Sequence, residues 1–322
     1  MKNIITVLAI AIGLLSCSKE KAKPILKNSN GLINQVLLVM DEGLWNDKEG
    51  AALKEFTDRD VLGLPQKEKQ FKIIQIPTVS FKNLFRAQKN ILIVKKDSVN
   101  TFDIQYDVFA SPQVVITITG TTSEELIKQI NTHGEEVIQT FKASDLKALQ
   151  HRLHKERIDI SKIKTFNENK FSFEITKGYK FVDDTGDFVW YRKRVTDEKT
   201  LNLMAYVSVL PEEVNDSTLI EYRNAIGKKY IPGEFEGTHY ITEAAYEPDT
   251  FKTELAGLKG YVSYGKWTVK DDWIAGPFIN YTLIDQKNNK LYFLEGFCYA
   301  PSASKRDLMF ELEALLKTVR FE

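Results

Sequence analysis

Residues 201–209, LNLMAYVSV, decide the fold of the second half of this chain. Every second residue from position 201 to 209 is aliphatic, and a period of two places these side chains on one face of a β-strand. Similar segments predict further strands at 171–175, 188–193, 238–246, 250–265, 275–284 and 290–299. Only residues 285–289 separate the last two, which is typical of a hairpin. The strands are therefore expected to pair antiparallel.

Two helices are predicted to cover this sheet. Thr218 and Glu221 have the spacing of a helix N-terminal cap. Ser302 or Ser304 is expected to cap a final helix. That helix has one apolar stripe, formed by Leu308, Leu312, Leu315 and Val319. Residues 171–322 are therefore predicted to form a mainly antiparallel sheet packed by two helices.

Residues 34–156 alternate strands with helices. Strands are predicted at 35–40, 71–76, 90–94 and 114–119, and helices at about 45–56, at 80–88 and from the cap at Thr122 and Glu125 onward. The apolar spacing shifts near residue 145, which predicts a kink or a second helix there. The alternation predicts an α/β sandwich of about four strands. With residues 157–170 interpreted as a charged linker, the predicted fold class is α+β, with two α/β sandwich domains.

The first seventeen residues have the pattern of a bacterial lipoprotein signal. Residues 4–15 are apolar with two exceptions, and this run is shorter than the roughly 20 residues that span a bilayer. It matches a secretory signal instead. The sequence LLSC at 14–17 resembles the lipobox cleaved by the lipoprotein signal peptidase. The resemblance implies that residues 1–16 are removed, that Cys17 is lipidated and acylated, and that residues 17–33 form a tether.

The residue after the cysteine bears on the destination of such a lipoprotein. Ser18 stands where Asp would favour retention in the inner membrane, under the sorting rule known for enteric bacteria. Residues 19–24 lack the acidic run that marks surface export in some bacteria. We therefore expect a lipid-anchored protein of the bacterial cell envelope, in the outer membrane and facing the periplasm.

The charge balance limits the partners of the protein. Removal of residues 1–16 would leave 306 residues (322 minus 16), with 43 basic and 44 acidic side chains because Lys2 is lost. A near-neutral chain argues against nucleic acid as a partner, since phosphate contacts need a basic face. The expected partners are the membrane, through the lipid anchor, and an envelope protein or glycan.

The sequence contains no motif of metal or cofactor chemistry. HExxH, CxxC, GxSxG and a Walker loop are all absent from it, so we predict no cofactor and no metal site. Cys298 has no disulfide partner once Cys17 is lipidated. It lies in a predicted strand and is interpreted as a buried thiol in preference to a nucleophile.

One predicted loop combines tryptophans with carboxylates. Trp267, Asp271, Asp272 and Trp273 lie between two predicted strands. Their rings could stack on a sugar or a peptide while the carboxylates accept hydrogen bonds. The same aromatic side chains could instead cover the end of the sheet.

Two arginines complete the candidate surface for a ligand or partner. Arg86 and Arg306 could each bind a carboxylate or phosphate through two hydrogen bonds. Each could equally pair with a structural acid.

Two functions compete on this sequence. The first is a non-catalytic binding or assembly module of the envelope. The alternative is an envelope hydrolase with a dispersed site, formed by Asp271, Asp272, Arg223 and Tyr222. A hydrolase would bring titratable groups together in a deep pocket, whereas a binding module would present an apolar or aromatic surface.

Several stretches spread over most of the chain resemble one family. They are Leu44-Trp45, GLPQ at 63–66, Phe81 with Arg86 and Asn90, GPF at 276–278, and EGFCYAP at 295–301 followed by Lys305-Arg306. They are similar to an uncharacterised family of lipoproteins from Bacteroidota-type bacteria, the domain of unknown function 4837. This resemblance implies a lipoprotein and no known activity. The layout of residues 171–322 also resembles the PsbP/Mog1-like fold.

Overall fold

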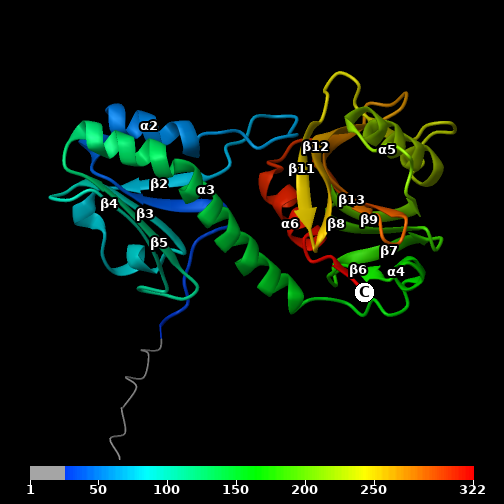
Figure 1. The fold of residues 1–322 in the computed structure, drawn as a ribbon, viewed down its shortest axis with the longest axis horizontal. Coiled ribbons are helices and arrows are strands. Elements are labelled where there is room, and N and C mark those ends of the chain that lie inside the picture. Colours follow the sequence, from blue (N-terminus) through cyan, green and yellow to red (C-terminus); the bar gives the residue numbers. More distant parts are fainter. Residues whose placement is uncertain (1–25) are drawn as a thin grey trace, which may run out of the picture.

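The computed structural model describes residues 26–322, which form two lobes joined by one long helix (Figure 1). We call residues 26–154 the N-terminal lobe and residues 155–322 the C-terminal lobe. Each lobe has its own sheet and its own helices. The predicted α+β class with two domains is therefore confirmed.

A five-stranded sheet forms the centre of the N-terminal lobe, in the order β2-β1-β3-β5-β4. The elements of this lobe are β1 Gln35–Val39, α1 Glu42–Trp45, α2 Lys48–Thr57, β2 Lys72–Ile76, the 3₁₀ turns η1 Thr78–Ser80 and η2 Asn83–Ala87, β3 Asn90–Lys96, β4 Thr101–Tyr106, β5 Val114–Gly120 and α3 Ser123–His154. Neighbouring strands pair in parallel except β4, which is antiparallel to β5 at the edge. The predicted four strands omitted β4.

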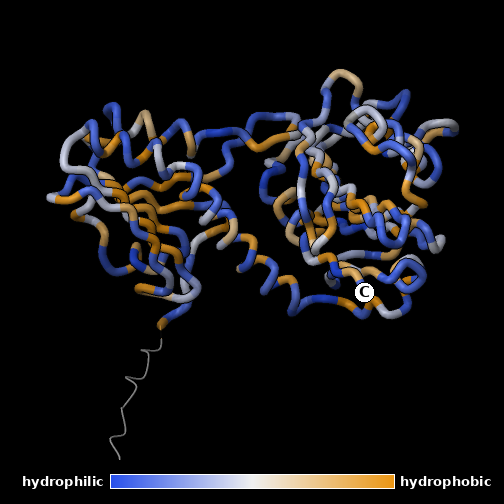
Figure 2. Tube along the Cα trace, viewed as in Figure 1, coloured by the Kyte–Doolittle hydropathy of each residue, from blue (hydrophilic) through white to orange (hydrophobic). Residues whose placement is uncertain are grey.

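Both faces of this sheet are buried, which explains the composition of its strands. Val36 and Leu38 of β1 contact the core beneath α2 and α3, whereas Leu37 and Val39 face the connection between β2 and β3. Strands buried on both faces have continuous apolar runs instead of alternation. Figure 2 shows this concentration of hydrophobic residues in the strands of the lobe.

Helix α3 is continuous, without the kink or second helix predicted near residue 145. Asp145 is fully buried, and its carboxylate lies 2.6 Å from the amine of Lys89. It also accepts hydrogen bonds from the Asn34 backbone N–H at 2.8 Å and the Asn90 amide at 3.1 Å. The apolar spacing shifts because one buried position of an unbroken helix is occupied by an aspartate.

A larger antiparallel sheet forms the C-terminal lobe, in the order β10-β12-β13-β14-β9-β8-β7, with β11 paired to β12. The elements are α4 Lys164–Asn169, β6 Phe171–Ser172, β7 Tyr179–Asp184, β8 Phe188–Thr196, β9 Lys199–Val209, α5 Asp216–Tyr230, β10 Tyr240–Thr242, β11 Asp249–Leu255, β12 Leu258–Val269, β13 Ala275–Asp285, β14 Lys290–Tyr299, α6 Arg306–Leu316 and β15 Arg320–Phe321. The sheet curves strongly around its core (Figure 1).

Helices pack on both faces of this sheet, as the residues of β9 illustrate. Leu201 and Leu203 lie in the core beneath α6, α4 and the end of α3. Met204, on the opposite face, lies in a second, aromatic-rich core beneath α5. The period of two in β9 thus marks one of two buried faces.

Two predicted elements of this lobe have different boundaries in the structure. The strand predicted at 250–265 is a hairpin of β11 and β12, which turns at Ala256 and Gly257 with positive φ angles. Helix α5 begins earlier than predicted, because the Asn215 side chain accepts the backbone N–H of Thr218 at 3.1 Å. Asn215 is therefore the cap and Thr218 lies inside the helix.

Residues 157–170, interpreted as a linker, include the short helix α4. Ile163 and Phe166 are buried in the core of the C-terminal lobe. The Phe166 ring contacts those of Phe171 and Phe173 edge-on, at 5.0 and 5.1 Å between centroids. Aromatic burial holds this charged segment against the sheet.

An arm of the N-terminal lobe, residues 58–70, reaches across to the C-terminal lobe (Figure 1). Leu64 is buried in the core of the C-terminal lobe. Gly63 has a φ of +72°, and a Cβ there would lie 2.8 Å from the backbone nitrogen of Gly265. The GLPQ stretch is thus a docking contact, and the two lobes are connected twice, by α3 and by this arm.

Candidate functional site

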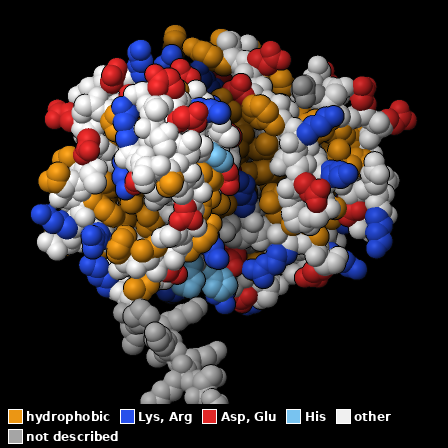
Figure 3. Space-filling view, turned by 60° about the vertical axis from the view of Figure 1, so that its left-hand side comes forward, with side chains coloured by type: hydrophobic (Ala, Val, Ile, Leu, Met, Phe, Trp, Pro, Cys, Tyr) orange, Lys and Arg blue, Asp and Glu red, His pale blue; other side chains and the backbone are white. Residues whose placement is uncertain are grey.

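A cleft of about 800 Å³ lies between the two lobes. Its walls are the arm, α3, α6 and the β11–β12 hairpin. Figure 3 shows the hollow between the lobes and the hydrophobic side chains around it. Ligand sites in proteins are often clefts of this size at the junction of two domains.

Apolar side chains from both lobes form much of the cleft wall. Leu62 of the arm is 44% exposed and Phe251 of β11 is 49% exposed. Leu146 of α3 and Phe310 of α6 line the cleft and are half-buried. The cleft therefore offers apolar surface that a bound molecule could cover.

The two glutamates of the cleft already have partners. Glu135 lies 2.6 Å from Nη1 of Arg59, and Glu313 lies 2.6 Å from Nζ of Lys317. The Tyr281 hydroxyl also donates to Glu313 at 3.1 Å. These two pairs account for four of the eight charged side chains that line the cleft.

Like Lys252 of β11, Lys142 of α3 lines the cleft without such a pair. Among residues 26–322, no hydrogen bond or ion pair joins its amine to another side chain. Burial lowers the pKa of this amine, while the negative charges of Glu313 and Glu135 oppose that effect. An anionic group that entered the cleft would find a partly desolvated partner here.

Arg306, one of the predicted site residues, also lines the cleft. Its Nε donates to the carboxylate of Asp307 at 2.8 Å, and its Nη1 donates to the Lys69 carbonyl at 3.1 Å. Of the two roles that the sequence left open, the structure provides the pairing with an acid.

The N-terminus of α6 is capped by the arm, whereas Ser302 or Ser304 was the predicted cap. The Glu68 carboxylate accepts the backbone N–H of Lys305 at 2.7 Å and that of Arg306 at 3.1 Å. The Ser304 hydroxyl donates to the same carboxylate. A negative charge at a helix N-terminus is favourable, so this contact holds the arm to the C-terminal lobe.

Arg86 lies in η2 of the N-terminal lobe, and it does not line the cleft. Its guanidinium lies over the rings of Phe81 and Phe109, at 5.7 and 5.1 Å. It forms no ion pair within the part of the chain that the structure describes. The structure therefore does not bring Arg86 and Arg306 into one site.

The Trp267–Trp273 segment does not present both indole rings to one ligand. Trp267 is buried in β12, and its Nε1 donates to the Cys298 carbonyl at 3.1 Å. Trp273 is 100% exposed in the following turn. Asp271 has a positive φ of 62°, and Asp272 accepts the Trp273 backbone N–H at 2.6 Å.

The residues named for a hydrolase are likewise dispersed. Arg223 is buried, and its Nε and Nη2 each donate to Glu295 at 3.0 Å. Tyr222 is the preceding, half-buried residue of α5. None of the hydrogen bonds of Arg223 involves Asp271 or Asp272, so the structure does not assemble that constellation.

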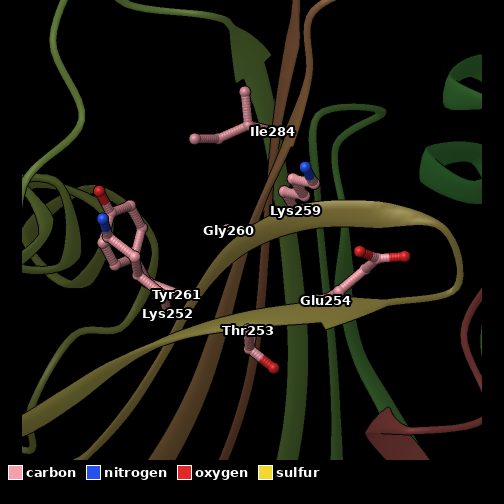
Figure 4. A pocket seen from close by; sticks show the side chains of 7 residues that line it. All are labelled: Lys252, Thr253, Glu254, Lys259, Gly260, Tyr261 and Ile284. Atoms are coloured by element: carbon pink, nitrogen blue, oxygen red, sulfur yellow. The ribbon is translucent and has the colours of Figure 1, made fainter.

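Besides a hollow of about 10 Å³ at α5, two larger hollows lie on the C-terminal lobe. One, of about 430 Å³, opens on the β11–β12 hairpin. Figure 4 shows that its side chains, including Lys252, Glu254 and Lys259, point in several directions without converging on one point. The other, of about 380 Å³, is lined by Trp267 among other aromatic residues.

The remaining predictions concern metal binding, membrane spans and the two cysteines. Within residues 26–322, no three His, Cys, Asp or Glu side chains are grouped to hold a metal ion. None of the helices in that range combines the length and apolarity needed to cross a bilayer. Cys298 is buried, and burial raises the pKa of its thiol to about 12. Cys17 lies outside the described residues.

Fold and cleft together define a two-domain α+β protein with a cleft between its lobes. Each lobe matches a family of its own: residues 159–318 match a domain of unknown function (DUF4837), and residues 29–154 match another domain of unknown function (DUF8532). The stretches quoted between positions 44 and 90 lie in the second of these matches, and those between 276 and 306 lie in the first. No curated protein matches it.

Solved structures show only distant likeness. LpqN, involved in cell envelope biogenesis of Mycobacterium tuberculosis, shares 9% identity at a TM-score of 0.31, over 47% of this chain and 82% of LpqN. The human StarD13 (DLC2) lipid transfer and protein localization domain shares 11% identity at a TM-score of 0.23. The match covers 44% of this chain and 88% of that domain. A Bacteroides thetaiotaomicron protein shares 9% identity at a TM-score of 0.21, over 48% of this chain and 45% of that protein. Such low TM-scores support no inference about function.

Proposed function

We propose that this protein is a membrane-anchored lipoprotein of the cell envelope that binds a partner in the interlobe cleft and catalyses no reaction. The cleft is the observation that carries the proposal, because both lobes contribute apolar walls to it. Hydrogen bonds from Gln139 and Arg59 lower the pKa of Glu135. A general acid needs the opposite shift, so the polar groups of the cleft favour binding.

The chemistry of the cleft favours an acidic partner with apolar side chains. Lys142 offers a cation without an ion pair, and Leu62 and Phe251 offer exposed apolar surface. An extended segment of an envelope protein combines these features, with one carboxylate for Lys142 and apolar side chains on either side. The glutamates paired with Arg59 and Lys317 would frame the site without repelling the segment strongly.

The proposed anchor is the lipidated Cys17. It would hold the protein at the outer membrane, with the two lobes facing the periplasm. Several acyl chains, at about 0.8 kcal/mol for each buried methylene, hold a protein at a membrane firmly, whereas one chain is marginal. A lipid anchor of this kind would place the cleft within reach of envelope proteins.

Site-specific photo-crosslinking in the producing cell tests the cleft. A photoreactive phenylalanine at Leu62 is expected to capture an envelope protein, because this side chain is exposed inside the cleft. The same group at Val209, 72% exposed and outside the cleft, is the control. Adding Lys142→Gln should weaken capture from Leu62 about tenfold, since a charge-assisted contact is lost. Equal capture from both positions, or no effect of Lys142→Gln, would contradict the proposed site.

Thiol titration of the purified full-length product tests the anchor. Cys298 is buried, with a pKa of about 12, and should not react with Ellman's reagent at pH 8 while the protein is folded. If Cys17 carries lipid, the folded protein has no reactive thiol and the protein in urea has one. One thiol in the folded protein and two in urea would show Cys17 to be free and refute the anchor.

A further inference from the structure

The curved sheet of the C-terminal lobe holds an aromatic pocket of about 380 Å³, separate from the interlobe cleft. Trp190 of β8, Trp267 of β12 and Phe297 of β14 line it, together with Tyr240 of β10. The rings of Tyr240 and Phe297 lie 4.6 Å apart between centroids. These four aromatic residues are 1–5% exposed and form the floor of the pocket, on four strands of one sheet.

The polar atoms of these rings are already used inside the protein. Nε1 of Trp267 donates to a backbone carbonyl at 3.1 Å, and Nε1 of Trp190 donates to Oδ1 of Asn202 at 3.1 Å. The Tyr240 hydroxyl donates to Glu295 at 2.6 Å. What the four rings present to the pocket is therefore apolar surface.

Arg192 is the cation that lines the pocket. Its Nε donates to the same Asn202 oxygen at 3.1 Å, and its guanidinium lies 4.6 Å from the centre of the Trp190 ring. These two contacts fix the plane of the guanidinium. Its terminal nitrogens have no hydrogen-bond partner among the side chains that the structure describes, and none of the described carboxylates lies within 4.0 Å of them. Glu234, exposed at the pocket, is the acidic lining residue and does not pair with Arg192.

We propose that this pocket binds a small organic carboxylate with an aromatic or short aliphatic body. The two free nitrogens of Arg192 match the two oxygens of a carboxylate in a bidentate pair. The rings of Trp190, Trp267 and Phe297, each 4–5% exposed, would form the floor beneath the apolar body. A volume of about 380 Å³ is within the range of small-molecule sites. This site depends neither on the lipid anchor nor on the interlobe cleft.

Calorimetric titration of the full-length protein tests the site with a defined probe, 4-phenylbutyrate. The neutral amide of the same acid is the comparison ligand, and tryptophan emission gives a second readout because Trp190 and Trp267 line the pocket. We expect the carboxylate to bind at least about tenfold more tightly than the amide, the factor that one charged hydrogen-bond pair supplies.

Arg192→Gln should remove this preference, because glutamine keeps an amide donor for Asn202 but has no charged fork. The matched control is Arg194→Gln on the same face of β8, whose side chain is 73% exposed. An unchanged thermal midpoint for Arg192→Gln verifies that the fold is intact. No saturable binding of the acid, equal binding of acid and amide, or equal loss in both variants would each overturn the proposal.

Discussion

At the scale of single residues, the Arg223–Glu295 pair dominates the interior of the C-terminal lobe. Arg223 is 3% exposed and Glu295 is fully buried. The guanidinium makes two hydrogen bonds to the carboxylate and a third to Thr242, and it lies 3.6 Å from the ring centre of Phe278. Burial raises the pKa of Tyr240 well above its ordinary value, so its hydroxyl remains a donor to Glu295. Each charge in this cluster is tolerated because its partner is present.

Arg223→Met is expected to lower the free energy of unfolding by about 3–5 kcal/mol, because it leaves the Glu295 carboxylate buried without its counter-charge. Urea unfolding monitored by circular dichroism measures this loss. The control is Arg194→Met, since Arg194 forms only an exposed pair, 3.9 Å from Asp197, and should change the free energy by less than about 0.5 kcal/mol. Equal losses of unfolding free energy in the two variants would show that the buried pair contributes no more to stability than the exposed pair.

At the scale of elements, α3 is held against the N-terminal lobe by close packing on α2. Gly134 lies at this contact, and a Cβ there would lie 2.5 Å from the ring of Phe56. Helix propensity alone favours alanine over glycine by about 1 kcal/mol. Overpacking against a ring costs about 1–3 kcal/mol. This cost exceeds the gain in helix propensity, so the net change in the free energy of unfolding is a loss of stability.

Gly134→Ala is therefore expected to destabilise the protein by about 1 kcal/mol, although the substitution favours an isolated helix. Gly43→Ala in α1 is the control, because nothing lies within 4 Å of a Cβ at that position, and it should not destabilise. Chemical unfolding of both variants, and of Gly134→Ala combined with Phe56→Leu, measures the effect. If the Phe56→Leu background does not reduce the cost of Gly134→Ala, the clash is not its cause.

At the scale of the whole molecule, the two connections between the lobes define the cleft. Helix α3 passes from one lobe to the other, and the arm returns across the gap to dock Leu64 in the opposite core. The Glu68 carboxylate fixes this docking at the N-terminus of α6. The width of the cleft thus depends on Glu68, a side chain that does not line the cleft.

Glu68→Ala is expected to lower the free energy of unfolding by about 1–2 kcal/mol, because α6 loses its cap and the favourable charge at its N-terminus. The radius of gyration from small-angle scattering should also rise if the arm is released. Glu68→Gln keeps one acceptor oxygen and should lie between wild type and Glu68→Ala. The exposed Glu212→Ala is the control; the same behaviour in Glu212→Ala and Glu68→Ala would refute the role of the arm.

Much of the secondary structure could be predicted from the sequence, because local periodicity was enough. The alternation in β9 and the cap at Thr122, which accepts the Glu125 backbone N–H at 3.2 Å, are both present in the structure. The sequence does not predict β4, although Phe102, Ile104 and Tyr106 alternate with polar residues there. It is a half-exposed edge strand, so its apolar signal was weak.

The binding surfaces were less predictable than the elements. Arg306 does line the cleft, and Trp267 lines the aromatic pocket. Nothing in the local sequence of Lys142 or Arg192 distinguishes these residues from other solvated basic residues. Their significance arises from neighbours on other elements, such as Asn202 for Arg192.

By itself, the sequence determined most of the strands and helices and the division into two units, since these follow from side-chain periods within about ten residues. Only the tertiary structure decided where the lobes meet and which charges remain unpaired. Glu68 contacts Lys305 across 237 positions of the chain. Such a contact depends on the packing of both lobes at once, and no local pattern of residues encodes it.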